Sequence, residues 1–141
     1  MKIFPCCAVP LVAALLLAGC DHIDIRPEGD SQRVLTGTVN FHVDEALPPD
    51  TVVLVRLVDT SNPGGAPMQL GEQTIKNPPN PPVPFRIEYQ ADDALLRHGL
   101  RIEARVSIGG KVRFYNVNGY ALTLAKAADP QEVWVNPAGK P

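Results

Sequence analysis

The stretch Leu100–Ile108, with the sequence LRIEARVSI, decides the fold class of this chain. Apolar residues occupy every second position, and charged or hydroxyl-bearing residues stand between them. Because successive side chains of a β-strand point to opposite faces, this alternation predicts a strand with one buried and one exposed face. Gly109-Gly110 follows and turns the chain back into a second strand over about 111–120.

The pairing of these two strands is predicted by matching their faces. A strict two-residue loop places Val106 opposite a charged residue, whereas a shift by one residue pairs Val106 with Phe114 and Ile108 with Val112. A one-residue slip exchanges the two faces of a strand, so the register that matches apolar residues is expected. This register needs a loop with an odd number of residues, which we predict to contain a bulge with the second glycine at positive φ.

In that register, six side chains point away from the core and form a candidate partner-binding strip: Arg101, Glu103, Arg105, Arg113, Tyr115 and Val117. Arginine and tyrosine are enriched in interface centres, where an aromatic ring flanked by guanidinium groups can seat a partner peptide. The alternative is a solvated sheet face, on which long side chains cover apolar surface. The sequence leaves both interpretations open.

Further strands are predicted on either side of this hairpin. A proline-containing turn separates the first two, and the second is apolar at almost every position, which is typical of a central strand covered on both faces or nearly so. The third is weaker, with Gly71 as a bulge, and a short helix capped by Asp92 follows the fourth. The expected strands cover residues 33–43, 51–59, 69–76, 85–90 and 132–136, and the helix covers 91–97.

This pattern predicts one all-β domain over residues 33–136, an antiparallel β-sandwich of about seven to eight strands, followed by a C-terminal tail, 137–141. Five of the eight residues in 77–84 are prolines. This segment is interpreted either as a stiff connector or as a polyproline ligand for an aromatic groove, and the connector is favoured.

The beginning of the chain predicts export. An apolar run from Ala8 to Leu17 leads through Ala18-Gly19 to Cys20, which resembles a bacterial lipobox. Such a signal implies a signal peptide over 1–19, lipidation of Cys20 and a polar tether over 20–32. The alternatives are a plain signal peptide and an uncleaved anchor, but the run is shorter than the ~20 residues that span a bilayer.

Cleavage before Cys20 removes Cys6 and Cys7, so the folded part has no free thiol, disulfide or cysteine-based metal site. It also removes Lys2, which changes the net charge from −2 to 12 − 15 = −3. This slight excess of acidic residues argues against a nucleic-acid binder, which would need a basic face. Acyl chains on Cys20 would anchor the protein in a membrane of the cell envelope, with its folded domain facing the periplasm. Asp21 resembles an inner-membrane retention signal, so the inner and the outer membrane both remain open.

No catalytic, metal or cofactor site is predicted. His22, His42 and His98 are far apart in sequence and form no ligand spacing. Neighbouring acids such as Asp92-Asp93 diverge rather than cooperate, and no serine lies in a nucleophile elbow. We therefore expect a protein that is not an enzyme.

The chain resembles the YscW/YbaY-type lipoprotein family over about 33–135. The residues that carry the resemblance are Leu35–Val39, Ala46–Val53 with its ALPPD turn, Pro84–Tyr89, Arg101–Ser107 and Gly110–Phe114. The sequence departs from the family pattern at Asn116–Gly119, which replaces a segment richer in threonine and aspartate.

This resemblance implies a lipid-anchored β-sandwich without enzymatic activity. In one branch of the family, pilotins bind the C-terminal tail of a secretin and help it to reach and assemble in the outer membrane. The expected partners are therefore membrane lipid, through Cys20, and a secretin or another envelope protein. The YbaY-like branch implies the alternative, a lipoprotein that binds an envelope glycan or is associated with polysaccharide metabolism. Exposed aromatic residues would serve that role, and the candidates are Tyr89, Tyr115, Tyr120 and Trp134.

Overall fold

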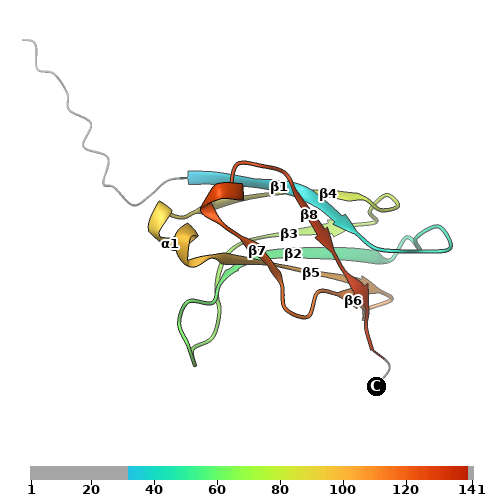
Figure 1. The fold of residues 1–141 in the computed structure, drawn as a ribbon. Coiled ribbons are helices and arrows are strands. Elements are labelled where there is room, and N and C mark those ends of the chain that lie inside the picture. Colours follow the sequence, from blue (N-terminus) through green and yellow to red (C-terminus); the bar gives the residue numbers. More distant parts are fainter. Residues whose placement is uncertain (1–31, 140–141) are drawn as a thin grey trace, which may run out of the picture.

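The computed structural model describes residues 32–139, which form two packed β-sheets (Figure 1). The smaller sheet has the order β4-β1-β8, and the larger has the order β3-β2-β5-β6-β9 with β7 also paired to β5. The all-β sandwich is thereby confirmed. The elements are β1 (Gln32–Asn40), β2 (Thr51–Asp59), β3 (Met68–Lys76), β4 (Val83–Gln90), α1 (Asp93–His98), β5 (Leu100–Ile108), β6 (Lys111–Tyr115), β7 (Tyr120–Leu122), the 3-10 turn η1 (Leu124–Lys126), β8 (Gln131–Trp134) and β9 (Asn136–Pro137).

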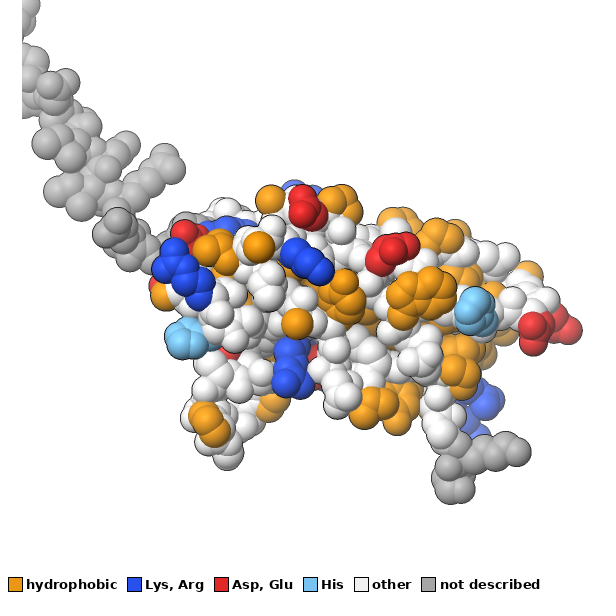
Figure 2. All heavy atoms as spheres, in the orientation of Figure 1, with side chains coloured by type: hydrophobic (Ala, Val, Ile, Leu, Met, Phe, Trp, Pro, Cys, Tyr) orange, Lys and Arg blue, Asp and Glu red, His pale blue; other side chains and the backbone are white. Residues whose placement is uncertain are grey.

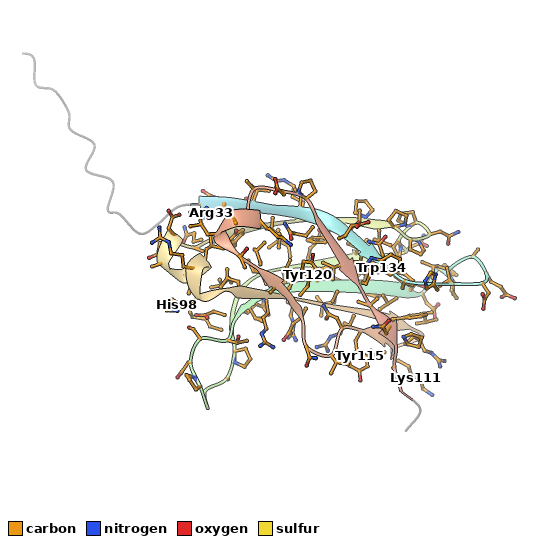
Figure 3. All side chains as sticks on the ribbon, viewed as in Figure 1. Arg33, His98, Lys111, Tyr115, Tyr120 and Trp134 are labelled. Carbon is orange, nitrogen blue, oxygen red and sulfur yellow. The ribbon has the colours of Figure 1, made fainter. Side chains whose placement is uncertain are left out.

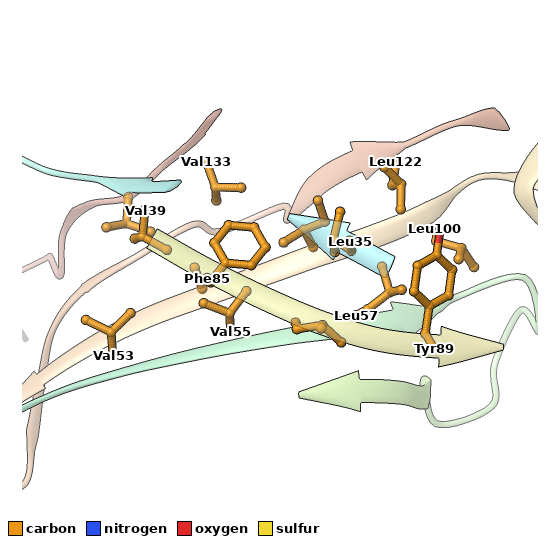
Figure 4. Close-up of a cluster of buried hydrophobic side chains, with 14 of the residues drawn as sticks. Leu35, Val39, Val53, Val55, Leu57, Phe85, Tyr89, Leu100, Leu122 and Val133 are labelled. Carbon is orange, nitrogen blue, oxygen red and sulfur yellow. The ribbon is translucent and has the colours of Figure 1, made fainter. Parts of the chain in front are cut away.

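The core lies between the two sheets and follows from the alternation in the strands. In β4 every second side chain is buried, and in β5 the apolar positions from Leu100 to Val106 are buried while the charged positions are exposed or half-buried. Figure 4 shows how both sheets contribute to this layer. Its fully buried members include Leu35, Val39, Val53, Val55, Leu57, Leu100, Leu122 and Val133. Burial of such side chains contributes about 1.5–3 kcal/mol each and is the main force that stabilises the domain.

The C-terminal strand joins the two sheets. β8 pairs in parallel with β1, and after Val135 the chain enters the larger sheet, where β9 pairs with β6. The Val135 N–H donates to the Asn40 carbonyl at 3.0 Å at the crossing point. The β1–β8 pair is thus parallel in an otherwise antiparallel sandwich. It brings the Gln131 carbonyl so close to Gly37 that no side chain fits there.

One end of the sandwich is covered by α1, whose Leu96 is fully buried. As predicted, Asp92 is the N-cap, and its carboxylate accepts a hydrogen bond from the Leu95 N–H at 2.7 Å. Asp93 instead pairs with Arg33 of β1 at 2.5 Å. The two adjacent acids therefore have separate structural roles.

The predicted register of the β5–β6 hairpin is correct for Val106, which lies opposite Phe114. The predicted pairing of Ile108 with Val112 is wrong, because Ile108 pairs with Lys111. The loop has two residues, both glycines at positive φ, as a tight hairpin turn requires. The extra residue is Arg113 in β6, so the bulge lies within the strand rather than in the loop.

Three other segments differ from the prediction. The strand expected over 111–120 is divided into β6 and β7 by a turn at 116–119. The first strand ends at Asn40 rather than at residue 43. Pro137, predicted to lie in the C-terminal tail, belongs to β9 and pairs with Phe114 of β6.

The bulge predicted near Gly71 is present, since the β2–β3 register shifts there.

The connector predicted over 77–84 is shorter in the structure: residues 77–82 connect β3 of the larger sheet to β4 of the smaller one, and Val83 and Pro84 already belong to β4. Beyond this connector, the edges of β3 and β4 approach each other, and the Arg86 N–H donates to the Gln73 side-chain carbonyl at 2.6 Å. No helix within residues 32–139 is long and apolar enough to cross a membrane. The predicted signal peptide, Cys20 and nearly all of the predicted tether lie outside the described residues.

Candidate functional site

The candidate site is on the outer face of the larger sheet, the face directed away from the core. Val53, Val55 and Leu57 of β2 are fully buried, so the alternate positions Val52 and Leu54 point outward, where they are half-buried. β2 is therefore largely apolar on both faces, but within residues 32–139 its outer face is only partly covered, since Val52 and Leu54 keep part of their surface in water. The prediction of a central strand covered on both faces or nearly so is confirmed: β2 lies between β3 and β5, and its outward side chains are half-buried, with Val58 buried.

Register brings three strands together on this face. Leu54 lies beside Arg105 of β5, which in turn lies beside Tyr115 of β6. Arg56 lies beside Glu103. A hollow of about 400 Å³ opens over these strands. Its walls are Arg56, Glu103, Ala104, Arg105, Val112, Tyr115, Asn116 and Val117.

Two of the three charged side chains on the walls of the hollow form an ion pair with each other, and the third does not. Arg56 donates from Nη2 to Oε2 of Glu103 at 2.7 Å, and both side chains are about one-third exposed. Arg105 makes no hydrogen bond or ion pair with any side chain of residues 32–139. The hollow therefore holds one compensated ion pair and one further positive charge.

Apolar side chains border the hollow on the β6 side. Val112 is 42% exposed, Tyr115 is 38% exposed and Val117 is 75% exposed. Figure 3 shows Tyr115 at this margin of the larger sheet. Single exposed apolar residues are common on proteins, and here three of them lie around one hollow.

Asn116 fixes the loop that carries Val117. Its side-chain carbonyl accepts from the Ala104 N–H at 2.9 Å, and its amide donates to the Ile102 carbonyl at 2.9 Å. The Asn116 N–H also donates to the Ala104 carbonyl at 3.2 Å. The chain therefore leaves β6 at a defined angle, which holds Val117 outward.

Four of the six predicted strip residues line the hollow: Glu103, Arg105, Tyr115 and Val117. The other two do not. Arg101 lies farther along β5 and donates from Nη1 to the Asn118 carbonyl at 3.0 Å, while the bulge places Arg113 beside another depression, next to Lys111 and Phe114. Val112, expected to face inward, instead lies beside Ser107 on the outer face, because the bulge follows it.

Sequence reasoning missed Arg56, Val112 and Asn116. The charge of Arg56 within an apolar strand was a usable signal, because a charged side chain there has to point to an open face. Asn116 carried no signal in the sequence, since its two hydrogen bonds depend on a turn that alternation does not reveal.

A second aromatic position lies on the smaller sheet. Trp134 of β8 is 50% exposed, and its ring lies 5.5 Å from that of His42 between centroids (Figure 3). Tyr89, named above as a candidate for glycan contact, is instead in the core at 3% exposure. Burial raises the pKa of Tyr89, and the nearby Arg33 lowers it. Tyr89 is therefore unsuited to contact a glycan.

The described residues contain no group of three or more His, Cys, Asp or Glu side chains that could hold a metal ion. Figure 2 shows that anions, cations and apolar side chains are interspersed over the face in view. What the outer face offers is a hollow with one ion pair, one further cation and an apolar border. Such an arrangement suits the binding of a polypeptide segment.

Known proteins include a family and a solved structure that are similar to this chain. The model of a family described as type III secretion system lipoprotein chaperone (YscW) matches residues 30–134. The fold is similar to the solved structure of an alternative pilotin from the type II secretion system of Vibrio cholerae. The TM-score is 0.65 at 24% sequence identity, over 78% of this chain and 100% of the pilotin chain. No curated protein matches the chain.

Proposed function

The chain belongs to the YscW family of type III secretion system lipoprotein chaperones, and from that premise we propose that it acts as a pilotin-like chaperone in the cell envelope. In this proposal the protein is not an enzyme. It binds the C-terminal tail of a secretin subunit on the outer face of the larger sheet, while acyl chains on Cys20 hold the complex on the membrane.

The observation that carries the binding site is the outer face of β2, which is largely apolar but only partly covered. Leu54 and Val52 point to this face, although central strands that are apolar on both sides are normally covered on both sides. Val112 and Val117 extend the apolar surface toward β6. A bound tail supplies the missing layer and removes this apolar area from water, at about 25 cal/mol per Å².

Two matched valines test the location of the site. Val112 on the larger sheet is 42% exposed, and Val34 on the smaller sheet is 41% exposed. The lipid-anchored protein is immobilised, and detergent extracts of the envelope are passed over it. We expect Val112→Asp to lose most of the captured secretin, because a carboxylate would be desolvated at the interface, and Val34→Asp to capture it as the unchanged protein does. Equal capture by both variants would remove the outer face as the binding site.

The same capture experiment tests the partner. Recovery of an envelope glycan without any secretin would favour the YbaY-like alternative and contradict the chaperone role.

The anchor is tested separately. Cys20→Ser is expected to release the protein from the membrane fraction, because a tether without acyl chains has no membrane affinity of this kind. Mass spectrometry of the processed amino terminus gives the direct readout. An unmodified Cys20 would contradict the anchoring part of the proposal and leave the binding site unaffected.

A further inference from the structure

We infer that Arg105 is a carboxylate-binding residue, and that the segment bound on the outer face presents an Asp or Glu side chain flanked by apolar residues on both sides. This inference rests on the proposed function and specifies what that site recognises. It follows from the position of Arg105, from the state of its neighbours and from the apolar groups beside it.

Arg105 lies in the middle of the outer face. It is in β5, with Leu54 of β2 on one side and Tyr115 of β6 on the other. Its side chain is half-buried and lines the hollow. A guanidinium group in this position is partly removed from water by its neighbours, which strengthens its interaction with an anion.

The nearest acid is already engaged. Glu103, two residues before Arg105 and on the same face, is bound by Arg56 at 2.7 Å between Nη2 and Oε2. Within residues 32–139 no other acidic side chain lines the hollow. The three charges sum to +1, so the hollow is complementary to a single negative charge from a partner.

The apolar groups decide between the two sources of a carboxylate. Leu54 and Tyr115 flank Arg105 on opposite sides, and Val112 and Val117 extend the apolar border. A segment that continues past Arg105 in both directions covers both flanks. A terminal carboxylate would end at Arg105 and leave one flank exposed. The geometry therefore points to a side-chain carboxylate within the segment.

The test uses the full lipid-anchored protein in detergent and synthetic peptides that correspond to the C-terminal tail of the cognate secretin. Affinity is measured by isothermal titration for three peptides: the natural tail, the tail with every Asp and Glu replaced by Asn and Gln, and the tail with an amidated C-terminus. We expect the second peptide to bind about tenfold more weakly, and the amidated peptide to bind as the natural one does.

On the protein side, Arg105→Ala is expected to weaken binding of the natural tail about tenfold, and Arg105→Lys less, since lysine keeps the charge but loses the bidentate geometry. Arg113→Ala is the matched control, because Arg113 is a cation on the same sheet outside the hollow. It should change the affinity less than about twofold. Arg105→Glu should recover binding when the critical acid of the peptide is replaced by lysine. Circular dichroism and thermal unfolding verify that each variant is folded, and Arg105→Gln replaces any that is not.

Several results would overturn the inference. Unchanged binding by Arg105→Ala, together with a loss in Val112→Asp, would show that the face binds the tail without a carboxylate, so the proposed function would stand and the inference would fail. Loss of binding only on amidation would assign the anion to the terminus and would also overturn it. A natural tail that does not bind the unchanged protein would refute the proposed function and the inference with it.

Discussion

The substitution Gly37→Ala should separate the C-terminal strand from the rest of the sandwich. Gly37 is in β1, between Phe85 of β4 and Gln131 of β8. A Cβ atom added there would lie 2.1 Å from the Gln131 carbonyl oxygen and 2.9 Å from its carbonyl carbon. Both are backbone atoms, so the clash cannot be relieved by a change of side-chain rotamer. β8 would have to move.

The loss of unfolding free energy in Gly37→Ala can be estimated from the contacts that β8 makes. Overpacking of a well-packed core costs about 1–3 kcal/mol, and each ladder hydrogen bond lost costs about 1 kcal/mol more. Displacing β8 also uncovers Val133, which is fully buried. The lower entropy of the unfolded chain with alanine offsets about 0.4–1 kcal/mol. The net loss is about 3 kcal/mol, which lowers Tm by about 12 °C or more for a domain of this size.

Thermal unfolding followed by circular dichroism measures this effect. Gly139→Ala is the control, because nothing lies within 4 Å of a Cβ atom added at that glycine, and it should leave Tm unchanged. A Tm of Gly37→Ala within 2 °C of the unchanged protein, a margin of about 0.5 kcal/mol, would refute the reasoning. It would mean that β8 can move away from β1 at little cost.

Three further predictions concern stability. Burial raises the pKa of Tyr89 above 10.0, so the folded protein holds the phenol proton more tightly than the unfolded chain, and stability that is present below pH 10 should fall as the pH rises above it. Denaturant titrations at pH 8 and pH 11 should show a smaller alkaline loss of stability for Tyr89→Phe. An identical loss in both proteins would contradict the assignment. Asp92→Ala should cost about 1 kcal/mol in urea unfolding, because the Leu95 N–H loses its cap, and a loss below about 0.3 kcal/mol would argue against the cap. Leu57→Ala should cost about 3 kcal/mol and Leu54→Ala about 1 kcal/mol or less, because they lie on opposite faces of β2; equal costs would mean that the outer face is covered.

Strand faces could be predicted from the sequence, because they depend only on local alternation. The pairing of Val106 with Phe114 followed from matching apolar faces. The position of the bulge did not follow, because a bulge in the loop and a bulge at Arg113 produce the same pairing for Val106. This difference affects the candidate site, because the bulge at Arg113 places Arg113 outside the hollow and brings Val112 to the outer face.

Strand neighbours are less accessible to sequence reasoning. The four residues of β8 have a clear alternation, with Gln131 and Val133 buried, but nothing in them reveals that they pair in parallel with β1. The close contact between Gly37 and the backbone of Gln131 explains why glycine is needed in β1, but this contact can be recognised only when the positions of both strands are known. The same limit explains Asn116, whose side chain replaces ladder bonds across a turn.

The position of β1 has a mechanical consequence. A force applied at Gln32 along the axis of β1 would load a strand that is bonded on one side to β4 and on the other to β8. Interstrand hydrogen bonds lie across that axis, so both ladders are loaded in shear and resist together instead of opening one bond at a time. Separation of β1 from the sandwich under such a load would require both ladders to break at once.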